Sequence, residues 1–188
     1  MEPLAVELAT ARLERAKRAL EEFEAAKSHK AAEAAWADFL LASSNIYSKL
    51  EQGAKGNGKS AGWFGRQKRM RADDPVMRYL HHARNSEEHG LELITERHPD
   101  GGNNQGFGEK TEWIIQTIDE KTGALGEPVP GWMYGPHVKL AAVRDRGVLY
   151  SPPDVVRPHG DPHVNGTYAI ERLAAMIAEA AELASARG

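Results

Sequence analysis

Residues 31–50 read AAEAAWADFLLASSNIYSKL, and this stretch decides the fold class. Five apolar residues and one serine recur here in steps of four, three, four, three and four residues. They are Ala32, Trp36, Phe39, Ser43, Ile46 and Leu50. That period places all six on one face of a helix. A helix with one apolar face buries it against other elements. The stretch therefore predicts a helix over about residues 30–52 that forms a seam of a helical bundle.

Three further segments carry helical patterns. Residues 3–27 repeat apolar side chains at three- and four-residue steps behind Pro3, which suits a first helical position. Asp74 followed by Pro75 indicates a capped helix start, and the pattern after it predicts a helix over about 74–95. The last stripe predicts a helix over about 167–187. We expect these four helices to pack as an up-down bundle.

Two regions between the helices have different compositions. Residues 53–72 contain five glycines, which predicts a basic loop. Residues of about 105–160 carry strand-like runs, and six prolines lie between Pro128 and Pro158, which disfavours helix. The strand-like runs are 113–118, 138–143 and 148–150. The expected fold class is mainly α (α+β): one domain over residues 1–188, a four-helix bundle with a small β-rich insertion between the third and fourth helices.

Composition restricts the chemistry. The chain has no cysteine, which excludes disulfides, thiolate catalysis and cysteine-ligated zinc. No apolar run reaches the length of a membrane span, and the first residues lack the pattern of a signal peptide. We therefore expect a cytoplasmic protein that has no membrane partner.

The net charge of -3 conceals a separation of charge along the chain. Residues 52–72 contain no Asp or Glu and six Lys or Arg, so this stretch carries +6 and the remainder carries -9. Such a stretch predicts a basic patch for a polyanion. Trp63 and Phe64 lie inside it, and they either stack on RNA bases or pack back on the bundle. The expected RNA- or phosphate-binding residues are Lys55, Lys59, Trp63, Arg66, Lys68, Arg69 and Arg71, together with His82.

Residues 84–89, RNSEEH, combine a permanent cation, an amide and an imidazole. On a helix, Arg84 and Asn85 approach the same region of surface as His89. A guanidinium can hold a phosphate oxygen, and an imidazole with a pKa near 6.5 can transfer a proton at neutral pH. An amide can orient the phosphate. The same residues can also form an ordinary solvated helix surface, which is the commoner outcome for an Arg and a His at this spacing.

The order Arg, Asn, three residues and His, late in the third helix of an expected bundle, resembles the motif of the HEPN family (higher eukaryotes and prokaryotes nucleotide-binding domains). The resemblance covers mainly residues 30–95 and the closing helix, and the β-rich stretch departs from a minimal bundle of that family. It implies a homodimer that joins two motifs in one cleft, and a metal-independent endoribonuclease of the kind found in toxin–antitoxin or phage-defence systems. By that resemblance Arg84, Asn85 and His89 are catalytic, no metal or cofactor takes part, and an antitoxin protein is a potential partner. It equally allows a non-catalytic module that binds a nucleotide or a protein.

Two other patterns point to different chemistry. Residues 53–60, GAKGNGKS, satisfy the string of a phosphate-binding loop, which requires a strand before it and a helix after it. His137, His159 and His163 suggest a metal site, but Gly160 and Pro162 break the helical spacing between the last two. We expect neither nucleotide hydrolysis nor metal binding at these positions.

Overall fold

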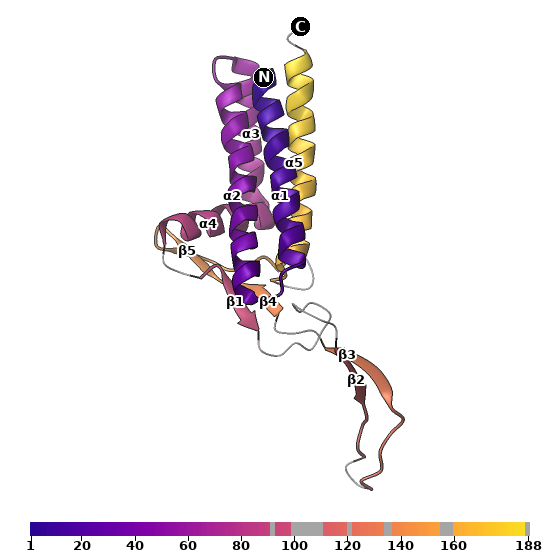
Figure 1. Ribbon diagram of the computed structural model, residues 1–188. Coiled ribbons are helices and arrows are strands. Elements are labelled where there is room, and N and C mark those ends of the chain that lie inside the picture. The colour runs from indigo at the N-terminus through magenta and orange to yellow at the C-terminus, as the bar shows by residue number, and fades with distance from the viewer. Residues whose placement is uncertain (91–92, 99–110, 120–121, 134–136, 155–159, 187–188) are drawn as a thin grey trace.

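The computed structural model describes residues 1–90, 93–98, 111–119, 122–133, 137–154 and 160–186. Within them the chain is mainly helical, with small antiparallel sheets (Figure 1). The helices are α1 Pro3–Glu24, α2 His29–Ala54, α3 Gly58–Asp73, α4 Pro75–His89 and α5 Pro162–Ser185. The strands are β1 Thr95–His98, β2 Thr111–Ile115, β3 Val129–Met133, β4 His137–Leu140, β5 Val143–Asp145 and β6 Val148–Tyr150.

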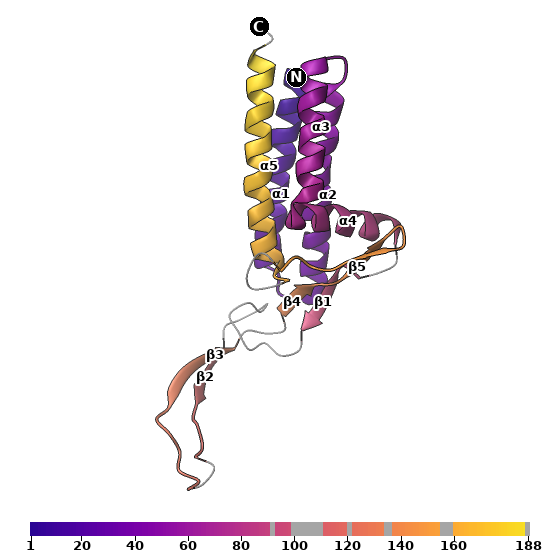
Figure 2. The same ribbon diagram turned by 180° about the vertical axis from the view of Figure 1, so that it is seen from behind.

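Four helices run side by side with alternating directions, and the fifth lies across them. Figure 1 shows α1, α2, α3 and α5 as the long columns, with both chain ends at the same end of the columns. Helix α4 lies across the long helices, away from the end that carries the two termini, and β5 runs beside it. Figure 2 shows the same arrangement from behind. The up-down arrangement of the four long helices agrees with expectation. The sequence analysis assigned the third of them to residues 74–95, and that assignment is wrong: the third long helix is α3, and the helix that starts at Pro75 is α4, which lies across the others.

Helix α3 lies in the segment predicted to be a loop. The Oδ1 of Asn57 caps it by accepting from the Ser60 amide at 2.9 Å. Its buried residues are Ser60, Trp63, Phe64 and Gln67, at steps of three, one and three. Each interior glycine costs about 1 kcal/mol relative to alanine, and burial of one large aromatic side chain contributes about 1.5–3 kcal/mol. Tertiary packing therefore outweighs the poor helix propensity.

The core lies between the long helices and confirms the predicted seam. The positions 32, 36, 39, 43, 46 and 50 of α2 are all buried. The rings of Trp36 and Phe39 stack with centroids 4.9 Å apart, and Phe23 of α1 meets Trp36 at 5.9 Å. Such aromatic pairs add to the free energy of apolar burial. This cluster joins the end of α1 to the first half of α2.

Helix α4 begins where the sequence predicted and ends earlier. The Oδ1 of Asp74 accepts from the amides of Val76 and Met77 at 3.0 Å each, which confirms the predicted cap. The other carboxylate oxygen accepts from the Tyr168 hydroxyl of α5 at 2.7 Å. The helix ends at His89 and not near residue 95, because Thr95–His98 forms β1 and pairs with β4.

The described strands form three antiparallel pairs: β1 with β4, β2 with β3, and β5 with β6. Arg146 and Gly147 join β5 to β6, and both have positive φ, of 51° and 82°. A two-residue turn of this kind matches the twist of the strands that it connects. The hydroxyl of Tyr79 in α4 donates to the carbonyl of Ala141 at 2.7 Å, just before β5. This bond helps to hold the β5–β6 hairpin against α4.

None of the described helices combines the length and apolar character that crossing a membrane requires.

Two glycine substitutions test the packing of the bundle. A Cβ at Gly53 would lie 2.2 Å from the Cβ of Ala5, so α1 and α2 approach too closely for alanine. We expect Gly53→Ala to lower the free energy of unfolding by about 1–3 kcal/mol. The matched control is Gly62→Ala in α3, where a Cβ meets nothing within 4 Å; it should stabilise by about 0.5–1 kcal/mol. Urea unfolding followed by circular dichroism measures both, and equal effects would contradict the close contact.

Candidate functional site

Two side chains of α4 meet at one carboxylate of the β5–β6 hairpin. Residues 82 and 85 lie three apart on α4 and therefore share a face. The Oδ2 of Asp145, at the end of β5, lies 2.8 Å from the Nδ1 of His82. The same oxygen accepts from the Nδ2 of Asn85 at 2.9 Å. One part-buried carboxylate therefore fixes the orientation of an imidazole and an amide.

The hydrogen bonds continue from Asn85 to the guanidinium of Arg84. The Oδ1 of Asn85 accepts from the Nη1 of Arg84 at 3.4 Å, and the same nitrogen forms an ion pair with Glu88. The Nε of Arg84 is buried and has no hydrogen-bond partner among the described residues. The five side chains His82, Asp145, Asn85, Arg84 and Glu88 are called the α4 network below.

The surroundings of Asp145 keep it ionised and define the tautomer of His82. Hydrogen bonds from Asn85, and then from His82, hold the pKa of Asp145 below its usual value. A carboxylate only accepts, so the Nδ1 of His82 carries the proton and Nε2 is the basic nitrogen of the neutral ring. The imidazole also stacks on the ring of Tyr150 from β6, with centroids 3.6 Å apart and planes within 12°.

The neighbouring His81 has a different environment. Its ring centroid lies 5.1 Å from that of His82, but it lines a pocket toward α2 and α3. Burial, and after it the positive charge of Arg71, lowers the pKa of His81 to about 4. His81 is therefore neutral at neutral pH.

The structure brings together some of the residues that the sequence singled out. Arg84, Asn85 and His82 meet in the α4 network. His89 is the last residue of α4, and its side chain lies outside the described part of the structure. Asp145 and Tyr150 were missed because they lie about 60 residues further along the chain. The strand pattern at 148–150 and the Arg-Gly turn before it were the available signals for a hairpin, but nothing in them indicated contact with α4.

The basic stretch divides into an exposed part and a buried part. Lys55, Lys59, Arg66, Lys68 and Arg69 are exposed, whereas Arg71 is half-buried over the ring of Tyr47 at 4.4 Å. Lys68 pairs with Glu51 at 3.3 Å.

The structure corrects the expectation for Trp63. Its side chain is 4% exposed, and its indole donates to the Oε2 of Glu179 in α5 at 2.8 Å. Of the two alternatives for Trp63 and Phe64, packing against the bundle is the one observed, and neither ring is available to stack on a base.

The structure also describes residues of the two other sequence patterns, the phosphate-binding string at 53–60 and the histidines considered for a metal site. The string over residues 53–60 spans the end of α2 and the start of α3, so a helix stands where a phosphate-binding loop needs a strand. His163 pairs with Glu24 at 2.7 Å, and His159 lies outside the described residues. Over the described ranges, no group of three or more side chains gathers that would hold a metal ion.

Comparison of the chain with protein-family models, curated proteins and solved structures finds no match.

Substituting Asp145 measures how much its carboxylate contributes to the free energy of unfolding. Asp145→Ala leaves His82 and Asn85 without their acceptor, and we expect a loss of about 1–3 kcal/mol near neutral pH. Because the folded-state pKa of Asp145 is lowered, this contribution is present above the pKa of an unfolded Asp, near 3.9, and is lost as pH falls through the lower folded value.

The matched control is Asp38→Ala, whose side chain is 53% exposed in a 3.9 Å surface pair with Arg15. Its effect should stay below about 0.5 kcal/mol at every pH. Urea unfolding at about pH 7 and about pH 3 measures both variants. A loss for Asp145→Ala that is no larger than the control would contradict a structural role for the network.

Proposed function

We propose that this chain is a metal-independent endoribonuclease of the HEPN kind, which cleaves RNA by attack of the ribose 2'-hydroxyl. One observation supports this proposal above the others: the α4 network holds a guanidinium and an oriented imidazole on one partly exposed helix surface. Arg84 and Asn85 of the motif therefore lie in a network of hydrogen bonds, and the oriented imidazole in that network is His82. An incidental Arg and Asn on a solvated helix would not need a part-buried acceptor from a distant hairpin.

The proposed reaction requires no added reactant. A base removes the proton from the 2'-hydroxyl, the 2'-oxygen forms a bond to the adjacent phosphorus, and the bond to the 5'-oxygen breaks as that oxygen takes up a proton. The products carry a 2',3'-cyclic phosphate and a 5'-hydroxyl. Arg84 would stabilise the added negative charge on the phosphate oxygens, and His89 would transfer the proton.

His82 takes a supporting role in this scheme. Asp145 engages its Nδ1, so any contact with RNA would run through Nε2. Asn85 connects that pair to Arg84 and would position the phosphate.

The exposed basic residues of α3 supply the proposed RNA surface. Among the described residues, no acidic side chain lies within ion-pair distance of Lys59, Arg66 or Arg69. The three positions lie on the solvent side of α3, opposite its buried face. Helix α3 leads directly into α4, so RNA bound along it would lead toward the network. Phosphate contacts of this kind provide affinity without base specificity.

The proposal includes the assembly that the family resemblance implies. A homodimer would join two α4 surfaces into one cleft, in the cytoplasm, and an antitoxin protein would be a natural partner for such an enzyme.

A second candidate is a non-catalytic module that binds a nucleotide or a protein at the same surface. The engagement of Arg84 favours it, because the Nη1 of Arg84 already contacts Asn85 and Glu88 within one chain. A guanidinium held in this way must exchange partners before it can bind a phosphate.

Cleavage without metal tests the enzyme directly. We expect the purified chain to cleave single-stranded RNA in excess EDTA and to leave 2',3'-cyclic phosphate ends. Arg84→Ala and His89→Ala should each lower the rate by at least about 10²-fold. Arg78→Ala, an exposed arginine on the same helix, removes the same charge and should cleave like wild type. Equal cleavage by all four proteins would remove the catalytic assignment, and absence of cleavage with retained RNA binding would favour the second candidate.

The salt dependence of binding tests the RNA surface. Substituting Lys59, Arg66 and Arg69 together by alanine should weaken RNA binding and lower the slope of log affinity against log salt by up to about 2, since each phosphate contact contributes about 0.7 on a single strand. Arg15, Arg18 and Lys27, exposed residues on and just after α1, provide a triple variant of the same charge. Fluorescence anisotropy with a labelled RNA measures both. The same slope in both triple variants would show that α3 is not the contact surface.

A further inference from the structure

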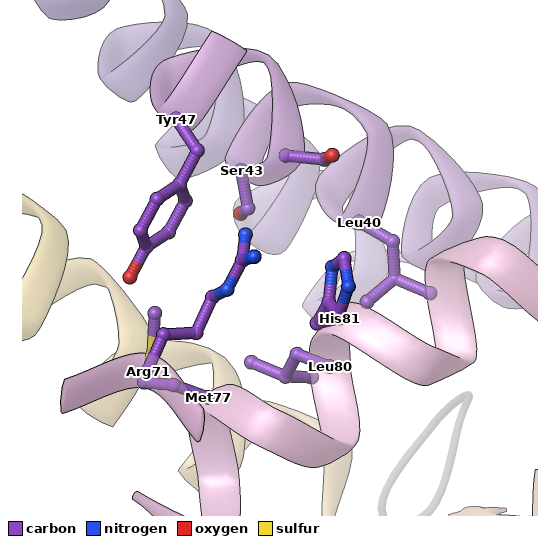
Figure 3. Close-up of a pocket in the computed structure, with 8 residues that line it drawn as sticks. Leu40, Ser43, Tyr47, Arg71, Met77, Leu80 and His81 are labelled. Carbon is purple, nitrogen blue, oxygen red and sulfur yellow. The ribbon is translucent and has the colours of Figure 1, made fainter. Parts of the chain in front are cut away.

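A pocket opens between α2, α3 and α4, next to the α4 network (Figure 3). It encloses about 20 Å³ and is open to solvent on one side. Apolar side chains, including Leu40 and Leu80, form most of its wall. Figure 3 shows the guanidinium of Arg71 between the rings of Tyr47 and His81, directed toward Ser43. Three helices therefore each contribute a polar group to one small space.

The charge of Arg71 has no close counter-ion in the described chain. Its guanidinium lies over the Tyr47 ring, and no described carboxylate lies within ion-pair distance. The nearest candidates are engaged elsewhere: Asp74 with the start of α4, Tyr168 and Arg172, and Glu51 with Lys68. Burial lowers the pKa of Arg71, and the opposing effects of Tyr47 and Glu51 offset that burial only in part. A half-buried cation in this condition favours an anionic ligand.

The second observation is the hydroxyl of Ser43. This side chain is 8% exposed, and its Oγ has no hydrogen-bond partner among the described residues. Buried polar atoms of folded proteins are nearly always paired, so a hydroxyl in a pocket wall with no partner in the described protein can donate to a ligand there. His81 completes the set, because its neutral imidazole carries one N–H donor.

We propose that this pocket binds the phosphoryl group of a phosphate monoester or of an RNA backbone, held by Arg71, Ser43 and His81. A tetrahedral oxyanion presents oxygens to donors from three directions, whereas a planar carboxylate presents two. The cavity admits about one small polar group and not a whole nucleotide, so the remainder of the ligand would stay outside.

This site does not depend on the proposed ribonuclease activity. His81 and His82 are neighbours whose rings are 5.1 Å apart, so a phosphoryl group in the pocket would lie beside the network and not within it. Binding at the pocket can therefore be measured whether or not RNA is cleaved.

The experiment is an NMR titration of the imidazole of His81 in the full chain, with inorganic phosphate as the probe. In the free protein we expect a pKa near 4 for His81, lowered by burial first and then by Arg71, His82 and Arg84, while Asp145 opposes the shift. Near pH 4 inorganic phosphate is a monoanion, and its charge offsets the positive charge of Arg71, so saturating phosphate should raise the pKa of His81 by about one unit. Acetate is the planar control. No saturable change with phosphate, or an equal response to acetate, would overturn the proposal.

Substitutions of the pocket residues test whether phosphate binds there. Arg71→Met keeps the apolar stem and should weaken phosphate binding at least tenfold, while Arg18→Met, an exposed arginine of α1, should leave it unchanged. Ser43→Ala, which retains the packing of α2, should weaken it several-fold, whereas Ser48→Ala at an exposed position of the same helix should not. Equal affinity in Arg71→Met and Arg18→Met would rule out the pocket. Arg84→Ala should still bind phosphate, which separates this site from the ribonuclease proposal.

Two short RNAs then identify the source of the phosphoryl group. A 5'-phosphorylated oligonucleotide that raises the pKa of His81, next to a 5'-hydroxyl oligonucleotide that does not, would assign the pocket to a terminal phosphate. An equal response to both would assign it to the RNA backbone. Failure of both would contradict the phosphoryl assignment.

Discussion

The carboxylate of Asp74 determines how the helices are arranged. One oxygen caps α4 by accepting from two backbone amides. The other oxygen accepts from the Tyr168 hydroxyl of α5, and the Nε of Arg172, also in α5, lies 3.6 Å from it. The backbone amide of Asp74 donates to Met70 at the end of α3, and its side chain caps the start of α4 and binds α5. Since α4 then lies across the bundle, its two faces meet different surroundings, the bundle on one side and the β5–β6 hairpin on the other.

Two adjacent histidines of α4 show the result. Consecutive positions on a helix point about 100° apart, so His81 and His82 face different partners. His81 is neutral at physiological pH because burial and Arg71 disfavour its charge, while His82 is oriented by a carboxylate. His81 is thus a neutral hydrogen-bond donor beside Arg71, whereas His82 is an imidazole oriented by Asp145. The proposed anion pocket and the imidazole held by Asp145 therefore belong to neighbouring residues that face different surroundings.

Features that arise from local periodicity were predictable from the sequence. The seam of α2, the Asp74–Pro75 start of α4, the strand at 148–150 and the mainly helical class follow from spacing and capping, which act over a few residues. Helix α3 was not predictable in this way, because its glycines favour a loop and only the burial of Trp63 and Phe64 against other elements reverses that preference. The crossing direction of α4 and the partnership of Asn85 with Asp145 depend on contacts between residues distant in the chain, and no local pattern encodes them. Arg84 and Asn85 were singled out from the motif at 84–89, but their contact with Asp145 could come only from the fold.

The turn at Arg146–Gly147 has a consequence for how mutational scans of this chain would be interpreted. Its two positive φ angles set which side chains of the hairpin point toward α4, and therefore where the carboxylate of Asp145 lies. A bulky residue at Gly147, or one extra residue in the turn, would shift the pairing of the two strands and carry that carboxylate to the opposite side of the ribbon. Gly147 would then behave in a functional screen like a residue of the site, although it contacts neither an imidazole nor a phosphate.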